Sequence, residues 1–239
     1  MRTDFSQKVS FFQKLRDYDY TLLMSILTLG VISVFAMYST DGGKILFHTK
    51  SHFVKFSIFF PMMIILSFID IKFWHAGSYF FYLIVLGLLV WVALYGVQAS
   101  GSKRWINLYF LNLQPSELMK VGVILCLAKY FHRIRTDRTN HFSTILISLT
   151  IVIVPTILVI TQPDLGTSIL ISLSGLIILW LSGLRIKYFV YSFILFLISL
   201  PFAISFLKPY QKLRILTFVD PDRDPLGSGY QIIQSKIAV

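Results

Sequence analysis

The sequence predicts an all-α, polytopic integral membrane protein with about seven transmembrane helices. Its 239 residues are 56% hydrophobic and only 14% charged, and the mean hydropathy is +0.73. A soluble domain has no interior large enough for that much apolar surface. The apolar residues also gather in stretches of about 20, the length that an α-helix needs to cross a bilayer. The predicted spans are Tyr20–Ser39, Phe53–Ile69, Tyr79–Gly96, Leu113–Phe131, Phe142–Ile160, Leu165–Leu184 and Tyr188–Leu207.

The connectors between these spans set the expected orientation. The formal net charge is +11 and the pI is about 9.8, a basic balance that also suits nucleic-acid binding. The Lys and Arg residues, however, lie in short loops between apolar spans, where an excess of them marks the cytoplasmic side. The N-terminal tail and the cluster from Lys129 to Arg138 outweigh the alternate loops. We therefore predict a multi-pass protein with a cytoplasmic N-terminus, surrounded by membrane lipid and without a nucleic-acid partner.

This orientation places three polar segments on the external side of the membrane. The loops that hold residues 103–105, 162–164 and 220–235 then all face outward. The sequence shows no internal repeat and no soluble linker. We therefore treat residues 1–239 as one membrane domain, with residues 208–239 as an external loop. Cys126 is the single cysteine and lies in an apolar run, which favours a packed side chain over a disulfide.

The first external segment combines cations with an aromatic ring. Lys103 and Arg104 are adjacent, and their side chains offer point-charge and forked donors for a phosphate group. Trp105 adds a flat apolar face that suits a sugar or a lipid. Interfacial anchoring explains the same residue types equally well, because Trp, Lys and Arg gather at membrane surfaces.

The start of the fourth span carries both a capping signal and a pair of charges. Gln114 or Ser116 is placed to cap the helix. Glu117 and Lys120 are three residues apart, so they share a helix face and can form an ion pair. Ionisable residues inside a span are costly and usually face a polar cavity. We favour that cavity role over a purely structural pair.

Residues 162–167 form a tight turn between the fifth and sixth spans. Asp164 is placed to cap the sixth span, the role that we favour for it. A role in a shared cavity is the alternative.

The segment after the last span holds three acids at alternating positions, Asp220, Asp222 and Asp224. Carboxylates in this arrangement can bind a divalent cation such as Mg²⁺ or Mn²⁺, or one of them can act as a general base. A solvated acidic loop is the alternative, but it explains neither the prolines at 221 and 225 nor the Gly-Ser-Gly-Tyr-Gln that follows. The residue types alone do not decide between a cation site, a general base and a solvated loop.

Taken together, the motifs resemble the SEDS family (shape, elongation, division and sporulation). The resemblance is carried by Gly-Ser-Lys-Arg-Trp-Ile from 101, Gln-Pro-Ser-Glu-Leu-Met-Lys from 114, Gln-Pro-Asp-Leu-Gly-Thr from 162 and Asp-Pro-Leu-Gly-Ser-Gly-Tyr-Gln from 224. Each motif is weak alone, but their order and spacing together are specific. The acids before Pro225 and the Gln-Ser-Lys-Ile-Ala that starts at residue 234 are most similar to the RodA elongation branch, rather than the FtsW division branch.

This resemblance implies a peptidoglycan glycosyltransferase of the bacterial inner membrane. Such a protein polymerises lipid II, an undecaprenyl-pyrophosphate-linked disaccharide peptide, together with a class B penicillin-binding protein. The family's essential external aspartate falls on Asp224. Side chains expected to bind the substrate or to meet the charge of its pyrophosphate are Lys103, Arg104, Trp105, Glu117, Lys120 and Arg223.

The resemblance also implies a longer fold than this sequence supplies. Family members have about ten spans, whereas this chain reaches Val239 after about seven. We therefore expect it to correspond to the N-terminal two-thirds of the family fold, truncated at the C-terminus. Two alternatives to an active polymerase follow: a flippase or transporter of a lipid-linked precursor, and a non-catalytic scaffold for the penicillin-binding protein.

Overall fold

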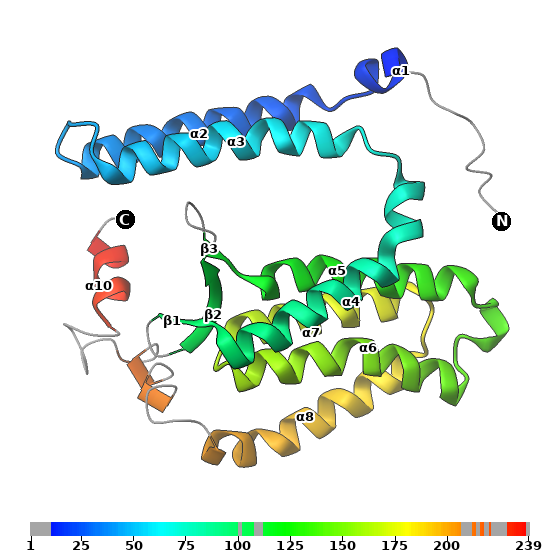
Figure 1. Cartoon of the computed structure of the whole chain (residues 1–239). Helices are drawn as coiled ribbons and strands as arrows, with labels where there is room; N and C mark the ends of the chain where they lie inside the picture. Colours follow the sequence, from blue (N-terminus) through cyan, green and yellow to red (C-terminus); the bar gives the residue numbers. More distant parts are fainter. Residues whose placement is uncertain are drawn as a thin grey trace. The chain divides into compact units, whose positions relative to one another are not determined.

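Each of the seven predicted spans is a helix in the computed structural model (Figure 1). The structure describes residues 11–99, 102–107, 112–206, 212–213, 216–217, 220 and 229–237. A short helix α1 (Phe11–Arg16) precedes the spans, and a 3-10 turn η1 (Thr136–Arg138) lies between two of them. The spans are α2 (Tyr20–Thr40), α3 (Phe47–Ser67), α4 (Ile71–Tyr95), α5 (Pro115–Arg133), α6 (Phe142–Thr161), α7 (Leu165–Leu181) and α8 (Ile186–Phe206).

Four of these helices are long and apolar enough to cross a membrane: α2, α3, α4 and α6. Helix α7 and residues Ile186–Ser199 of α8 are apolar but shorter. Helix α5 is less apolar than its neighbours because it carries Glu117, Lys120 and Lys129. A membrane segment with charges of this kind needs protein around it, and α5 packs against both α6 and α7.

The connector between α4 and α5 departs from the all-helical prediction. It forms a three-stranded antiparallel sheet of β1 (Val97–Ala99), β2 (Ser102–Asn107) and β3 (Asn112–Leu113), in that order. Trp105 lies opposite Val97, and Ile106 lies opposite Leu113. Such β-branched and aromatic pairs stabilise strands. The strands are so short that they give little alternating pattern in the sequence, which is why the sequence predicted only a connector here.

The chain divides into two compact units, residues 1–81 and residues 82–239. In the first unit, α2 and α3 form a helical hairpin whose connector contains Gly42 and Gly43, both at positive φ. Asp41 fastens the hairpin at this end, because its carboxylate accepts hydrogen bonds from the backbone N–H of Thr49 at 2.9 Å and from its hydroxyl at 2.6 Å. At the other end of the pair, Lys14 of α1 donates to the Phe68 carbonyl and to Asp70.

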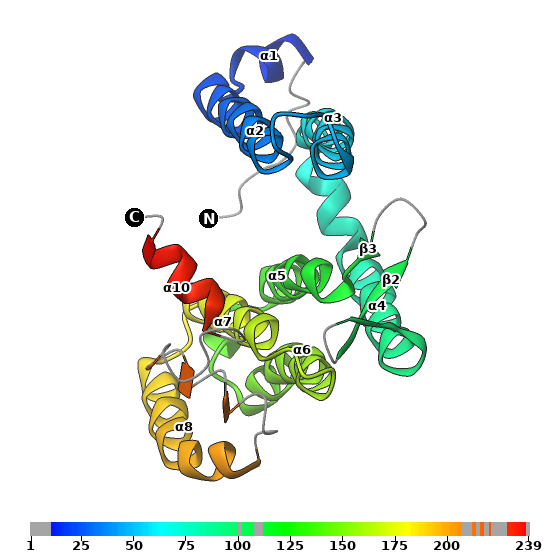
Figure 2. The same cartoon turned by 90° about the vertical axis from the view of Figure 1, so that its left-hand side faces the viewer.

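The second unit is built around a bundle of α5, α6 and α7, which Figure 2 shows nearly end-on. Its core is a set of fully buried apolar side chains, and Cys126 lies among the buried residues with a free thiol, as predicted. The second half of α4 is tied to this bundle, since the Tyr82 hydroxyl donates to the Ile151 carbonyl at 3.0 Å. The core side chains include Met119, Val123, Leu127, Val159 and Ile171.

The sequence predicts an external loop for residues 208–239. The described part of this segment contains a helix, α10 (Tyr230–Ile237). The first turn of this helix closes when the Gly229 carbonyl accepts hydrogen bonds from the N–H groups of Ile232 and Ile233. The helix carries Ile233 and Ile237 on one face and Gln234 and Ser235 elsewhere. Eight residues give too short a repeat for periodicity to have identified it.

Candidate functional site

Arg104 connects two of the polar segments that the sequence places on the external side. It lies on β2, and its Nη2 donates to the carbonyl oxygen of Pro163 at 2.7 Å. Its Nη1 lies 3.6 Å from Oδ1 of Asp164, with 21% and 10% of the two side chains exposed. Pro163 and Asp164 form the turn between α6 and α7. The predicted convergence of these two loops is therefore confirmed, and we call Arg104, Gln114, Pro163 and Asp164 the outer cluster.

Asp164 is the acceptor at the centre of the outer cluster. It is the N-cap of α7, and its Oδ1 accepts from the Thr167 N–H at 3.4 Å. The amide Nε2 of Gln114 donates to Oδ2 at 2.9 Å. The positive end of the α7 dipole also favours a carboxylate here. The capping role that we predicted for Asp164 is confirmed, and it coexists with the ion pair to Arg104.

The capping role that we predicted for Gln114 or Ser116 is wrong. Gln114 occupies the N-cap position of α5 but makes no side-chain capping bond, and Pro115 follows it at the first helical position. Its long side chain instead donates a hydrogen bond from the amide to Asp164. Ser116 is buried inside the first turn of the helix. Pro115 removes one N–H that would need a cap, which releases the Gln114 side chain for the contact between loops.

The guanidinium of Arg104 keeps donor capacity beyond these contacts. Its Nε is buried and has no hydrogen-bond partner among the described residues. A guanidinium has five N–H donors and favours planar, anionic acceptors. Arg104 is therefore both fixed by Asp164 and able to serve an oxygen acceptor. Trp105, the next residue on β2, is half-buried and points to the opposite face of the strand, since side chains alternate along it.

Glu117 and Lys120 form the predicted ion pair, with Nζ and Oε2 2.7 Å apart. The Glu117 side chain is 55% exposed and the Lys120 side chain 24% exposed. Glu117 lies in the first turn of α5, three residues after Gln114 of the outer cluster. This places a second cation near the same end of the bundle as Arg104. The cavity that we expect these residues to line stays a prediction.

A further polar contact near the α6–α7 turn is not predicted by the sequence. The Gln162 amide donates to the carbonyl oxygen of Leu89 at 2.9 Å, and both groups are buried. It joins the turn between α6 and α7 to α4. The sequence marked Gln162 as part of a turn motif, but nothing in it indicates a main-chain carbonyl 73 residues away as the partner.

Several predicted site residues lie outside the described residues: the side chain of Lys103, and Asp222, Arg223 and Asp224. Asp220 is described and half-buried, and its N–H donates to the Leu216 carbonyl at 2.9 Å. Within the described part of the chain, no group of three His, Cys, Asp or Glu side chains is placed to hold a metal ion. The cation site at Asp220, Asp222 and Asp224 therefore stays a prediction.

The chain is similar to curated proteins of cell-wall synthesis. It is 39% identical over 202 residues to the probable peptidoglycan glycosyltransferase FtsW of Buchnera aphidicola from Schizaphis graminum, covering 82% of this chain and 57% of the relative. It is 35% identical over 239 residues to the peptidoglycan glycosyltransferase MrdB of Escherichia coli K12, covering 99% of this chain and 63% of the relative. The chain thus spans about three-fifths of the length of these relatives.

Solved structures share the fold. One chain of a peptidoglycan synthase complex, studied for how it coordinates polymerization and crosslinking, superposes with a TM-score of 0.78 at 27% identity, covering 93% of this chain and 65% of that one. The rod shape determining protein RodA of Thermus thermophilus gives a TM-score of 0.65 at 22% identity, covering 77% and 59%. The protein is thus a multi-pass helical membrane protein. The FtsW/RodA/SpoVE family of cell cycle proteins matches residues 17–239, and the chain belongs to this family.

Proposed function

We propose that this protein is a peptidoglycan glycosyltransferase that polymerises lipid II in the bacterial inner membrane during cell elongation, alongside a class B penicillin-binding protein. The observation that carries the proposal is the family match over residues 17–239, which includes the outer cluster and the terminal acidic segment. Two relatives at 35% identity or more are named peptidoglycan glycosyltransferases. A synthase complex contains a chain of the same fold.

The proposed reaction joins two sugars and releases a pyrophosphate. The 4-hydroxyl oxygen of the acceptor attacks the anomeric carbon of the donor, the bond from that carbon to the pyrophosphate breaks, and the configuration inverts to β. A single displacement of this kind needs one base, in contrast to the acid and nucleophile pair of retaining glycosidases. Asp224 takes the hydroxyl proton in this proposal. The electron pair leaves with the pyrophosphate, whose charge must be met by cations.

The geometry supports different roles for the two described cations. Arg104 is already engaged by Asp164 and Pro163, so it fixes the sheet beside α5, and we assign it a positioning role. Lys120 is paired only with the more exposed Glu117 among the described residues, and its Nζ can turn toward an incoming phosphate. We therefore assign the main electrostatic role toward the leaving group to Lys120.

The geometry favours neither of the alternatives. A flippase needs charges along a path through the middle of the membrane, whereas Glu117 lies in the first turn of α5 and Lys120 one turn later. No contact among the described residues points specifically to a scaffold. Both alternatives remain outcomes of the experiment that follows.

The test is glycan-chain formation from purified lipid II by the 239-residue chain in vesicles, with a class B penicillin-binding protein and Mg²⁺ present. Wild type, Asp224→Ala and a matched control, Asp137→Ala, are compared at equal membrane insertion. Asp137 is an exposed acid in η1, paired only with Arg135 among the described residues. We expect polymer from wild type and from Asp137→Ala, and none from Asp224→Ala.

Polymer from Asp224→Ala at the wild-type rate would remove the base from the proposal. Absence of polymer from all three, with partner binding intact, would make the chain a scaffold. Transport of labelled lipid II across the vesicle membrane without polymer would make it a flippase. Repeating the wild-type assay with a chelator tests the predicted cation separately.

A further inference from the structure

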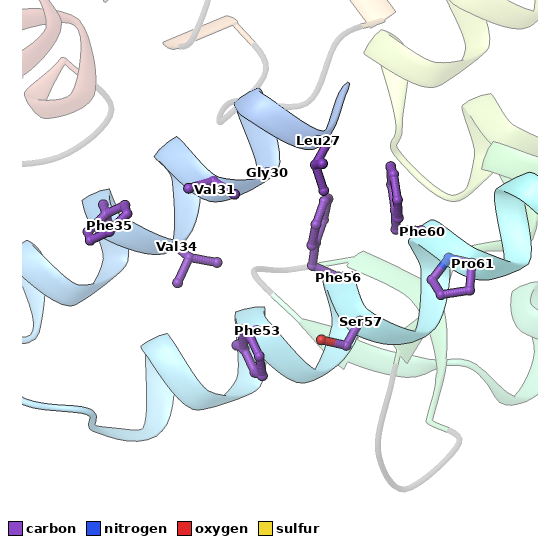
Figure 3. Close-up of a pocket in the computed structure, with 10 residues that line it drawn as sticks. All are labelled: Leu27, Gly30, Val31, Val34, Phe35, Phe53, Phe56, Ser57, Phe60 and Pro61. Carbon is purple, nitrogen blue, oxygen red and sulfur yellow. The ribbon is translucent and has the colours of Figure 1, made fainter. Parts of the chain in front are cut away.

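A groove runs between α2 and α3 in the first unit, far along the sequence from the outer cluster. Its volume is about 470 Å³, within the range of roughly 300–1,000 Å³ typical of small-molecule pockets. Figure 3 shows Leu27 and Phe56 pointing toward one another between the two helices. The groove is lined almost entirely by apolar side chains: Leu27, Gly30, Val31, Val34, Phe35, Phe53, Phe56, Phe60 and Pro61, with Ser57 as the only hydroxyl.

Gly30 is the reason that the two helices leave this space. A Cβ at this position would lie 2.1 Å from Cζ of Phe56, so only glycine lets the Phe56 ring lie against the α2 backbone. With that ring placed flat between the helices, Val31 and Phe53 stay largely exposed along the groove. The walls are apolar, which suits a hydrocarbon chain and offers little to a polar ligand.

The chain just before the α3 residues that line the groove is rich in lysine. The α2–α3 connector and the first turn of α3 contain Lys44 and Lys50, both exposed and both without an ion pair in the described part of the chain. Asp41 is the only acid from residue 41 to residue 55. Hydrogen bonds from the Thr49 hydroxyl and N–H lower the pKa of Asp41, so this carboxylate stays charged. It offsets one of the two lysines, and the segment keeps a net positive charge.

Lys50 and the groove-lining residues of α3 lie on the same side of that helix. Lys50, Phe53 and Ser57 follow one another at spacings of three and four, which places them on one helix face. Phe53 and Ser57 line the groove. Long side chains on a helix lean toward its N-terminus, so Lys50 leans toward the connector, where the end of a membrane helix meets lipid headgroups.

We propose that the groove between α2 and α3 binds one acyl chain of an anionic phospholipid, whose phosphate is held by Lys44 and Lys50. A lipid with this chemistry matches both features at once: a hydrocarbon tail for the apolar walls and a negative headgroup for the two unpaired cations. The site is separate from the proposed glycosyl transfer and does not depend on it. Its occupant would stabilise the α2–α3 pair.

The test is lipid binding to the detergent-solubilised full chain, measured by native mass spectrometry with phosphatidylglycerol and phosphatidylcholine of identical acyl chains. We expect phosphatidylglycerol to bind more tightly. The double variant Lys44→Gln/Lys50→Gln should weaken its binding by about 30-fold, as expected for the loss of two lysines at a membrane surface. Lys55→Gln is the matched control, since Lys55 is an exposed lysine of α3 that does not share the face of Lys50, and it should leave binding unchanged.

A second pair of variants tests the groove itself. Val31→Trp fills it, whereas Ile32→Trp places the same ring on a neighbouring exposed position of α2 outside the lining residues. We expect only Val31→Trp to abolish the preference for phosphatidylglycerol, with both variants retaining helical circular dichroism. Equal binding of the two lipids to wild type would overturn the proposal. So would stronger binding of undecaprenyl phosphate, or a Val31→Cys disulfide dimer that forms equally with and without lipid, because a second copy would then occupy the groove.

Discussion

The α2–α3 pair and the α5–α6–α7 bundle are both built from apolar helices, but protein covers them to different extents. In the most apolar stretch of α2, 6% of residues are buried, against 28% in α6. Leu29 of α2 is 66% exposed, whereas Leu127 of α5 is fully buried. A bilayer covers apolar surface as well as a protein core does. Hydropathy therefore identifies both regions as membrane helices and does not show which one forms a packed core.

The difference lies in the polar side chains that each region holds inside. The bundle buries Ser148, Ser168, Gln162 and Asp164. Gln162 links the α6–α7 turn to α4, and Asp164 links the same turn to the start of α5. The α2–α3 pair has fewer such contacts. The Ser33 hydroxyl lies 2.7 Å from Nε2 of His52, and the Thr49 hydroxyl donates to Asp41 at the connector. Packing of helix against helix is what allows polar groups to be buried and still satisfied. The site therefore belongs to the bundle, and the groove of the pair suits lipid.

The largest expected effect comes from removing core volume. Leu127→Ala should lower the free energy of unfolding by about 2–5 kcal/mol, because it leaves a cavity in the bundle. Leu29→Ala is the matched substitution on α2 and should cost far less, since the Leu29 side chain is largely exposed. SDS-induced unfolding in mixed micelles measures both. Equal losses would mean that the pair is packed as tightly as the bundle.

The next effect tests the outer cluster. Asp164→Asn removes the charge that Arg104 and Gln114 share, and we expect a loss of about 1.5–3 kcal/mol, the range for hydrogen bonds to charged groups. Adding Arg104→Gln should recover part of that loss, because no buried guanidinium is then left without its carboxylate. The same unfolding measurement gives the coupling. Strict additivity of the two substitutions would show that the ion pair contributes nothing.

Two glycines compare helix packing in the two regions directly. A Cβ at Gly175 would lie 2.5 Å from Cγ2 of Val152, a stiff branched side chain, so Gly175→Ala should cost about 1–3 kcal/mol. Gly30→Ala meets the outer end of the Phe56 ring, which can swing into the groove, and it should cost less. Gly166→Ala meets nothing within 4 Å and reports the helix-propensity change alone. A greater loss at Gly30 than at Gly175 would reverse the comparison.

The smallest effect concerns the exposed end of the first unit. The hydrogen bond and charge of Lys14 lower the pKa of Asp70, so the folded carboxylate binds protons less readily than the unfolded one. Its contribution to stability is therefore present above the ordinary carboxyl pKa of about 3.9 and is lost as the pH falls below it. The midpoint temperature of thermal unfolding should fall more steeply for wild type than for Asp70→Asn as the pH is lowered from about 5 to about 2. Asp17→Asn is the control and should follow wild type.

Hydropathy predicted all seven long helices but not all of their ends. Helix α3 begins at Phe47, not Phe53, and α4 at Ile71, not Tyr79. The missed turns contain His48, Lys50, Lys72 and His75, whose polarity hides them from a search for apolar runs. Helix formation there depends on local bonds, such as those from Thr49 to Asp41, which composition does not reveal.

The candidate site was predicted in outline only. Alternation of loops across the membrane was enough to bring Arg104 and Asp164 to the same side, and the spacing of Glu117 and Lys120 was enough to pair them. It was not enough to identify Gln114 as a partner of Asp164, because a long amide side chain can reach many acceptors. The roles of Lys103, Asp222, Arg223 and Asp224 stay predictions, since these side chains lie outside the described residues.

The most direct test of the central claim is to locate bound lipid II without requiring turnover. A lipid II carrying a photoreactive diazirine on its sugar would be irradiated with the full chain in vesicles, and the labelled peptides identified by mass spectrometry. We predict labelling between Arg104 and Lys120 that unlabelled lipid II suppresses and that Lys120→Gln weakens. Labelling confined to α2 and α3, or labelling that unlabelled lipid II does not suppress, would contradict a substrate site at this end of the bundle.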